Sequence, residues 1–191
     1  MIIDHDSKFI FVAVAKTACT SIQRSFGTTQ DPEPNIYHMH LKDIIKTNPE
    51  AKGYFKFGFV RNPYDRLVSA YHDLRYSKGH QSWAHPIQKY KTFKDFVLNL
   101  HNSPCRDFIH LKPQFEYLEL DGELGVDFVG RFERLNDDFK SVQELINIEE
   151  RSLDRHRSSS HEQYTTYYDT ETKNTVYELY RKDFEAFGYE K

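Results

Sequence analysis

The segment AKTACTS at residues 15–21 carries the residue types that a phosphate group needs. Lys16 supplies a mobile cation. Hydroxyl groups that can donate hydrogen bonds follow at Thr17, Thr20 and Ser21. The neighbouring residues are small, so backbone N–H groups at the start of a following helix can also reach an anion. The segment is therefore a candidate anion site, although a plain turn with a capping threonine and an exposed lysine fits the same residues.

A second candidate pair for an anion consists of Arg61 and Ser69. If the chain turns at Pro63, the Arg61 guanidinium can fold back toward the Ser69 hydroxyl, and the two side chains can hold one phosphate. The alternative is that Arg61 is an ordinary surface arginine and that Asp65 and Arg66 pair on the surface. Each pattern taken alone leaves both interpretations open.

Neither segment has the pattern of a nucleotide triphosphatase. The motif GxxxxGK[ST] is absent, because residues 15–21 contain no glycine and Lys16 precedes the small residues. A small-molecule kinase would need carboxylates for magnesium near the loop, and the sequence offers no convincing set. That kinase and a non-catalytic nucleotide-binding module are the alternatives to the function inferred below.

The candidate residues follow segments that are typical of buried strands. Residues 8–14 and 54–60 are nearly continuous apolar runs, and residues 127–130 form a shorter one, which suits a parallel sheet buried on both faces. Helical spacing or capping predicts helices at residues 21–26, 65–76, 93–100 (capped by Thr92), 135–146 and 170–187. Strands that alternate with helices predict a parallel α/β sheet with ligands at the carboxyl ends of its strands.

Bulk composition limits the classes of protein that fit. The chain has 191 residues and a mass of 22.8 kDa, which suits one domain over residues 1–191. A net charge of −3 predicts no overall attraction to nucleic acid or an anionic membrane. Two cysteines, Cys19 and Cys105, do not make a disulfide framework, so a reducing compartment fits. The first residues lack the pattern of a signal peptide or membrane anchor, so we expect a cytoplasmic protein.

Together, KFIFVAVAKTACTS and FGFVRNPYDRLVSAY resemble in order and spacing the two PAPS-binding motifs of the carbohydrate and heparan sulfate sulfotransferase superfamily (PAPS is 3′-phosphoadenosine-5′-phosphosulfate). Two later segments, VDFVGRFERLNDDF and LYRKDFEAFGYEK, are also similar to that family. The resemblance implies a three-layer, P-loop-like α/β fold with a central parallel sheet. It also implies a metal-independent enzyme that transfers a sulfuryl group from PAPS to an acceptor hydroxyl, with a carbohydrate favoured, and releases the bisphosphate PAP.

The resemblance also assigns roles to residues. The first loop of the family binds the 5′-phosphosulfate, and the second motif binds the 3′-phosphate through residues that here are Arg61 and Ser69. Many relatives have proline where Ala15 stands and glycine where Ala18 stands, so a methyl group at residue 18 could hinder a close approach to the ligand. The residues that match the first loop are Lys16, Thr17, Ala18, Cys19, Thr20 and Ser21.

Transfer to a hydroxyl needs a base, and three histidines are candidates. His38 and His40 are two residues apart, which on an extended segment places both imidazoles on one side. Their segment resembles the Tyr-His-x-His segment of heparan sulfate 2-O-sulfotransferases, which implies that His40 is the base and that His38 assists. His110, followed by a Pro-Gln pair, is the competitor. All three can instead be structural, and no zinc-binding pattern surrounds them.

Two loops complete the predicted site. Residues 77–91 are predicted to form a loop that closes a substrate cleft. In sulfotransferases a late loop often covers the 3′-phosphate and adenine, and the resemblance assigns this role to Arg157 and Ser158. The alternative for this charged segment is a solvated surface. The oligomeric state cannot be read from the sequence.

Overall fold

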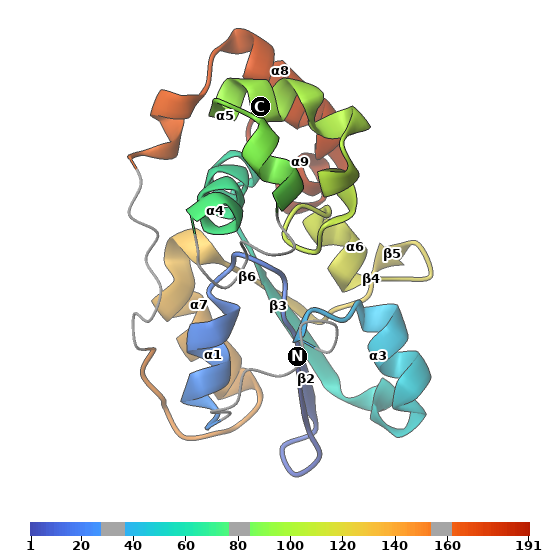
Figure 1. Ribbon diagram of the computed structural model, residues 1–191. Helices are drawn as coiled ribbons and strands as arrows, with labels where there is room; N and C mark the ends of the chain where they lie inside the picture. The colour runs from blue at the N-terminus through green and yellow to red at the C-terminus, as the bar shows by residue number, and fades with distance from the viewer. Residues whose placement is uncertain (28–36, 77–84, 154–161) are drawn as a thin grey trace. The chain divides into compact units, whose positions relative to one another are not determined.

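The computed structural model describes residues 1–27, 37–76, 85–153 and 162–191 (Figure 1). These residues form two compact units, and each unit combines two separate stretches of the chain. Unit 1 consists of Met1–Arg61 and Gln114–Arg157, and unit 2 of Asn62–Pro113 and Ser158–Lys191. The expectation of one domain over the whole chain stays a prediction.

Unit 1 contains a four-stranded sheet in the order β1-β2-β3-β6. Strands β2 (Phe9–Val12), β3 (Phe55–Val60) and β6 (Phe128–Arg131) are parallel, and β1 (Ile2–Asp4) is an antiparallel edge strand. The parallel α/β prediction and its three predicted strands are confirmed. Since all four residues of β2 are buried, its continuous apolar run reports a strand covered on both faces.

Helices cover both faces of this sheet and make three layers (Figure 1). On one face, the phenylalanines of β2 and β3 pack in one cluster with residues of α1 (Cys19–Ser25) and α7 (Leu135–Leu145). On the other face lie α3 (Leu41–Thr47) and α6 (Gln114–Leu118). Gly58 of β3 allows this second layer to approach closely, because a Cβ there would lie 2.5 Å from a Leu118 methyl carbon.

The other elements in the described part of unit 1 are short. They are two 3-10 helices and a two-stranded antiparallel sheet: η1 (Pro49–Gly53), η5 (Phe132–Arg134), β4 (Glu119–Leu120) and β5 (Glu123–Leu124).

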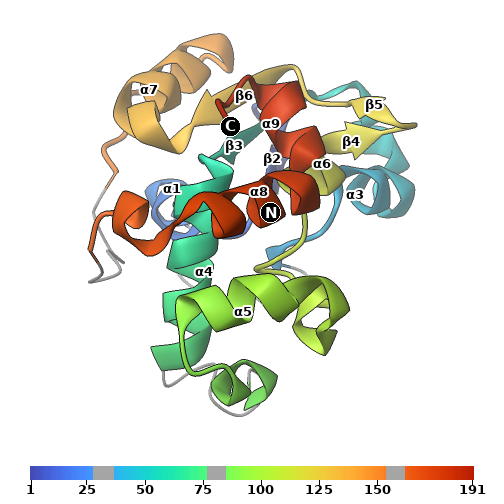
Figure 2. The same ribbon diagram turned by 90° about the horizontal axis from the view of Figure 1, so that it is seen from above.

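Unit 2 is helical (Figure 2), and its core is rich in aromatic side chains. Its elements are α4 (Pro63–Tyr76), η2 (His85–Lys89), α5 (Phe93–Asn99), η3 (Leu100–Asn102), η4 (Pro104–Asp107), η6 (Tyr164–Tyr167), α8 (Thr170–Leu179) and α9 (Arg181–Phe187). Two predictions about helix starts are confirmed, since Pro63 begins α4 and the Thr92 hydroxyl accepts the Asp95 N–H at 3.0 Å to cap α5.

The prediction of one helix over residues 170–187 is wrong. The chain leaves helical geometry at Tyr180, with φ −120° and ψ 24°, so α8 ends there and α9 begins one residue later. The Tyr180 side chain is buried, and its hydroxyl donates to the Leu111 carbonyl at 2.7 Å. Such a contact between distant parts of the chain is not encoded in helical spacing, which explains why the sequence pattern missed the break.

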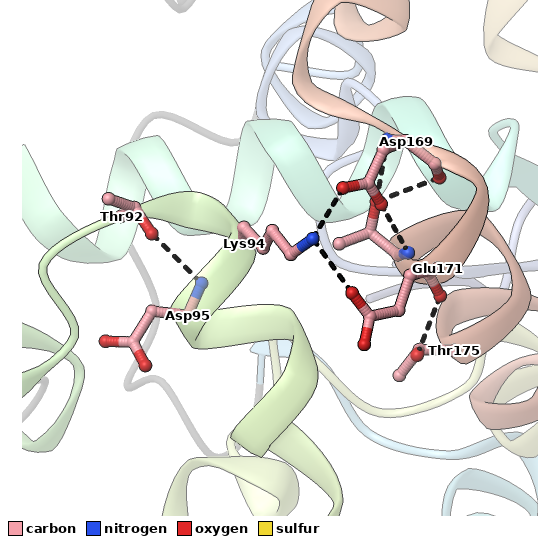
Figure 3. A network of polar contacts seen from close by, with 7 residues as sticks. Thr92, Lys94, Asp95, Asp169, Glu171 and Thr175 are labelled. Atoms are coloured by element: carbon pink, nitrogen blue, oxygen red, sulfur yellow. Dashed lines mark hydrogen bonds and ion pairs between the residues drawn. The ribbon is translucent and has the colours of Figure 1, made fainter.

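An ion-pair network on the surface of unit 2 connects α5 with the start of α8 (Figure 3). The Lys94 ammonium lies 2.7 Å from Asp169 Oδ2 and 2.8 Å from Glu171 Oε2. Asp169 also accepts the Thr172 N–H at 2.9 Å and so caps α8. The hydrogen bond from Lys94 is the main reason why the pKa of Asp169 is well below its usual range.

Within the described stretches, no helix combines the length and apolar character needed to cross a bilayer.

Candidate functional site

Three segments meet at the carboxyl edge of the parallel strands in unit 1. They are the loop after β2, which we call the first loop (residues 13–18), Arg61 directly after β3, and Phe132 directly after β6. Because parallel strands end at the same edge, segments that are far apart in the sequence come together here. This edge is where ligands bind in open α/β sheets.

The first loop has an uncommon backbone geometry. Lys16 (φ 70°) and Ala18 (φ 64°) are both in the left-handed region, which L residues other than glycine rarely adopt. The Ala18 carbonyl accepts the Ile22 N–H at 3.1 Å, which is the first hydrogen bond of α1. The glycine of many relatives at position 18 therefore has a physical reason: that backbone conformation is unstrained for glycine and costs about 1 kcal/mol for alanine.

Two of the three hydroxyl groups predicted for the site in residues 15–21, those of Thr17 and Thr20, have partners within unit 1. The buried Thr17 hydroxyl donates to the Val14 carbonyl at 2.9 Å, and the Thr20 hydroxyl lies 2.9 Å from the Tyr37 hydroxyl. In this arrangement Thr17 shapes the loop, so a ligand would meet its backbone N–H rather than its hydroxyl hydrogen. Ser21 is half-buried in the first turn of α1.

Cys19 begins α1 as a buried thiol. Burial raises the pKa of this thiol above its ordinary value, and a hydrogen bond with Tyr37 opposes the shift only in part. The side chain therefore stays neutral at physiological pH, so it adds no negative charge next to a bound anion. A small neutral side chain at this position is compatible with phosphate binding.

The Arg61 guanidinium reaches the first loop. Nη1 of Arg61 donates to the Lys16 carbonyl at 3.3 Å, and the guanidinium carbon lies 4.1 Å from the centre of the Phe132 ring. Only 8% of Arg61 is exposed, so the alternative of an ordinary surface arginine is wrong. The structure thus brings the two predicted phosphate ligands Lys16 and Arg61 together at one edge of the sheet.

Two residues at this edge were missed by sequence reasoning about the site. Phe132 provides the ring under the Arg61 guanidinium. Gln114 bonds to both backbone polar groups of Arg61. Gln114 belongs to the Pro-Gln pair after His110, which had been noted only as a neighbour of that histidine, and no local pattern links it to a residue 53 positions earlier.

His38 and His40 lie on the segment that leads into α3. Nδ1 of His38 is 2.7 Å from the Ala13 carbonyl, and since a carbonyl can only accept, Nδ1 carries the hydrogen and Nε2 is the basic nitrogen of the neutral ring. The His40 ring centroid lies 4.6 Å from that of Tyr117, and the His38 centroid lies 6.5 Å from it. Both imidazoles therefore face the same tyrosine, and His38 contacts the first loop directly.

The other candidate residues lie outside unit 1 or outside the described residues. Ser69 and His110 are buried in unit 2. Arg66, expected as a surface partner of Asp65, is also buried there, and its Nη2 donates to the Lys112 carbonyl at 2.6 Å and to the His110 carbonyl at 3.4 Å. The alternative that placed Arg66 on the surface is therefore wrong.

The prediction that Arg61 and Ser69 hold one phosphate stays a prediction. Arg157, Ser158 and most of the loop 77–91 fall outside the residues that the structure describes. Within the described part of the chain, no group of three or more histidine, cysteine or acidic side chains is arranged to hold a metal ion.

Comparisons with known proteins give one consistent result. Residues 1–190 match the profile of the sulfotransferase family. The chain is 24% identical to carbohydrate sulfotransferase 11 of Mus musculus over 99% of its own length and 66% of that protein. It is 25% identical to carbohydrate sulfotransferase 14 of Danio rerio, covering 99% of the chain and 62% of the relative. The chain thus spans slightly less than two thirds of these relatives, and no solved structure matches it significantly.

Proposed function

The chain belongs to the sulfotransferase family, and on that premise we propose that it transfers a sulfuryl group from PAPS to a hydroxyl group of a carbohydrate. The observation that carries this proposal is the contact between the buried Arg61 guanidinium and the first loop at Lys16. This contact supports a shared anion site, because it joins the Arg61 guanidinium to the backbone of the loop that carries Lys16, at the edge where ligands bind in such sheets.

The residues at this edge fit both phosphate-bearing ends of PAPS. Lys16 and the backbone N–H groups of residues 17–21 would hold the 5′-phosphosulfate, and Arg61 would hold the 3′-phosphate, to which the resemblance also assigns Ser69. The neutral Cys19 thiol adds no repulsion. When bound, PAPS supplies the activated sulfuryl group. Lys16 would then neutralise the charge that gathers on the departing phosphate.

For the acceptor proton we propose His40 as the base with His38 as its neighbour. Support for His38 comes from its hydrogen bond to Ala13, which directs the basic nitrogen Nε2 away from that carbonyl. A carbohydrate acceptor is supported by the names of the relatives, which are carbohydrate sulfotransferases. Family membership argues against the kinase alternative. The cytoplasmic location stays a prediction, which fractionation of cells that produce the tagged chain would test.

A transfer assay with radiolabelled PAPS and a panel of glycosaminoglycan and oligosaccharide acceptors tests the proposed activity. We expect label to appear in at least one carbohydrate, and we expect the His40→Ala variant to lower kcat while it leaves the affinity for PAP nearly unchanged. Tight binding of PAP without transfer to any hydroxyl acceptor, carbohydrate or other, would instead favour the non-catalytic nucleotide-binding module. Transfer only to an acceptor that is not a carbohydrate would refute the proposed substrate class.

A further inference from the structure

Gln114 makes two hydrogen bonds to the backbone of Arg61. Its Oε1 accepts the Arg61 N–H at 2.9 Å, and its Nε2 donates to the Arg61 carbonyl at 2.8 Å. The Gln114 side chain is fully buried, with 0% of the residue exposed. It begins α6 and approaches Arg61 from a part of the chain that is 53 residues away.

These bonds continue the sheet's hydrogen bonding beyond the end of β3. The pairing of β3 ends with Gly58 opposite Val12 on one side and with Val60 opposite Arg131 on the other. Arg61 follows directly and is buried, so its N–H and carbonyl need partners other than water. A primary amide offers one donor and one acceptor side by side, as a neighbouring strand would.

We propose that Gln114 is a positioning residue for ligand binding: it fixes the Arg61 backbone so that the guanidinium points at the first loop and lies over Phe132. The inference rests on the proposed function in one respect, because PAP affinity is its main readout. Arg61 has further contacts at Lys16 and Phe132, but both are made by its long, flexible side chain. The pair with Gln114, in contrast, holds the backbone from which that side chain starts.

The chain contains a matched control in unit 1. Gln143 is also buried, with 2% exposed, and it also pairs with an arginine backbone. Its Oε1 accepts the Arg151 N–H at 2.5 Å, and its Nε2 lies 3.4 Å from the Arg151 carbonyl. Arg151 has no part in the proposed site. Replacement of either glutamine by leucine therefore removes the same kind of contact, but only one replacement disturbs a ligand-binding arginine.

The first experiment measures PAP affinity by calorimetry together with the melting temperature for Gln114→Leu and Gln143→Leu. Both variants should melt at lower temperature, since each loses the hydrogen bonds of a buried amide, and the drop should be larger for Gln114→Leu because Arg61 is buried whereas Arg151 is exposed. Gln114→Leu should weaken PAP binding by about tenfold or more, whereas Gln143→Leu should stay within about twofold of the unmodified chain. A folded Gln114→Leu variant that binds PAP as tightly as the unmodified chain would overturn the inference.

The second variant, Gln114→Glu, keeps the shape of the side chain and remains useful if Gln114→Leu does not fold. A protonated carboxyl offers a donor and an acceptor like the amide, whereas a carboxylate would only accept and would face the Arg61 carbonyl. Burial raises the pKa of a carboxyl group, so the introduced glutamic acid should become protonated as the pH falls toward the mildly acidic range. The affinity deficit relative to the unmodified chain should therefore shrink between about pH 8 and about pH 5.5. A deficit that does not change over this range, or no deficit, contradicts the inference.

Hydrogen exchange at the Arg61 amide separates this inference from the proposed function, because it needs no ligand. In Gln114→Leu the Arg61 N–H should exchange much faster, while in Gln143→Leu it should keep its protection. Failure of the unmodified chain to bind PAP refutes the proposed cofactor, and faster exchange would still support the positioning of Arg61. Unchanged exchange at Arg61 in Gln114→Leu would refute the positioning itself.

Discussion

Arg61 and Arg151 are held in unit 1 by the same kinds of contact, yet only one of them lies in the candidate site. The backbone of each pairs with a buried glutamine, and each guanidinium lies over a phenylalanine ring, at 4.1 Å for Arg61 and 5.2 Å for Arg151. Each guanidinium also donates to a backbone carbonyl, that of Lys16 at 3.3 Å and that of Ser25 at 2.9 Å.

The difference between the two arginines is their place in the fold. Arg61 follows a central parallel strand, is buried, and contacts the first loop, whereas Arg151 is exposed and contacts the last residue of α1. A glutamine pair and an aromatic ring therefore do not by themselves distinguish the arginine in the candidate site from the one outside it. The carboxyl edge of the parallel sheet and the neighbouring lysine loop make one of these arginines a candidate ligand for phosphate.

The largest difference in PAP affinity is expected between the variants in which Arg61 or Arg151 is replaced by alanine. If Arg61 holds the 3′-phosphate as proposed, Arg61→Ala should weaken PAP binding by roughly 10- to 100-fold in a calorimetric titration, because charged hydrogen bonds to that phosphate are lost. Arg151→Ala, measured in parallel, should change the affinity by less than about twofold, because an exposed arginine outside the site has no phosphate to bind. Equal losses in the two variants would mean that the burial and position of Arg61 do not matter for binding.

A smaller effect is expected from a comparison of two lysines. Lys16→Ala removes the cation of the first loop and should weaken PAP binding by about tenfold. Lys94, which is ion-paired on the surface of unit 2, is the charge-matched control, and Lys94→Ala should leave PAP affinity unchanged. A comparable loss in both variants would show that general electrostatic attraction, rather than a built site, determines the affinity.

The Ala18→Gly variant tests the backbone strain in the first loop. Glycine relieves the left-handed strain at residue 18, so the variant should be more stable by at most about 1 kcal/mol in chemical denaturation. Without the methyl group, PAP should bind equally well or more tightly. Weaker PAP binding by Ala18→Gly would show that the alanine contributes a contact of its own.

The smallest effect is expected at the ion-pair network of Figure 3. The pKa of Asp169 is lowered, chiefly by Lys94, so the stability from this carboxylate is present above its unfolded pKa of about 4 and is lost as the pH falls through the lower folded value. Asp169→Asn should therefore melt slightly below the unmodified chain at neutral pH, and the difference should shrink as the solution is acidified. A difference that grows in acid would reverse the assigned sign.

Much of the fold was predictable because its signals are local. The apolar run at residues 8–14, Pro63 at the start of α4 and the Thr92 cap each act within a few residues, and all three were predicted correctly. Lys16 and Arg61 were assigned to opposite ends of one ligand from the resemblance of their segments to two family motifs, whereas the partner predicted for Arg61 was Ser69. The break at Tyr180 was not found, because it accompanies a contact between distant segments.

Gln114 shows the same limit within the candidate site. Its importance for Arg61 comes from hydrogen bonds across 53 residues, and a lone Pro-Gln pair gives no hint of them. The hydroxyl of Thr17 was expected to face a phosphate but donates to the Val14 carbonyl, a geometry set by the left-handed residues on either side of it. Composition and spacing identify such residues, but the direction of their hydrogen bonds depends on the folded backbone.

The central claim is that the edge formed by the first loop and Arg61 recognises PAPS, and its most direct test is one calorimetric series on the unmodified chain. The ligands are PAP, AMP, which lacks the 3′-phosphate, and ATP with magnesium. We predict that PAP binds tightly, that AMP binds at least about tenfold more weakly because Arg61 loses its ligand, and that ATP with magnesium does not displace PAP. The account would be contradicted if ATP with magnesium bound and PAP did not, or if PAP and AMP bound with equal affinity.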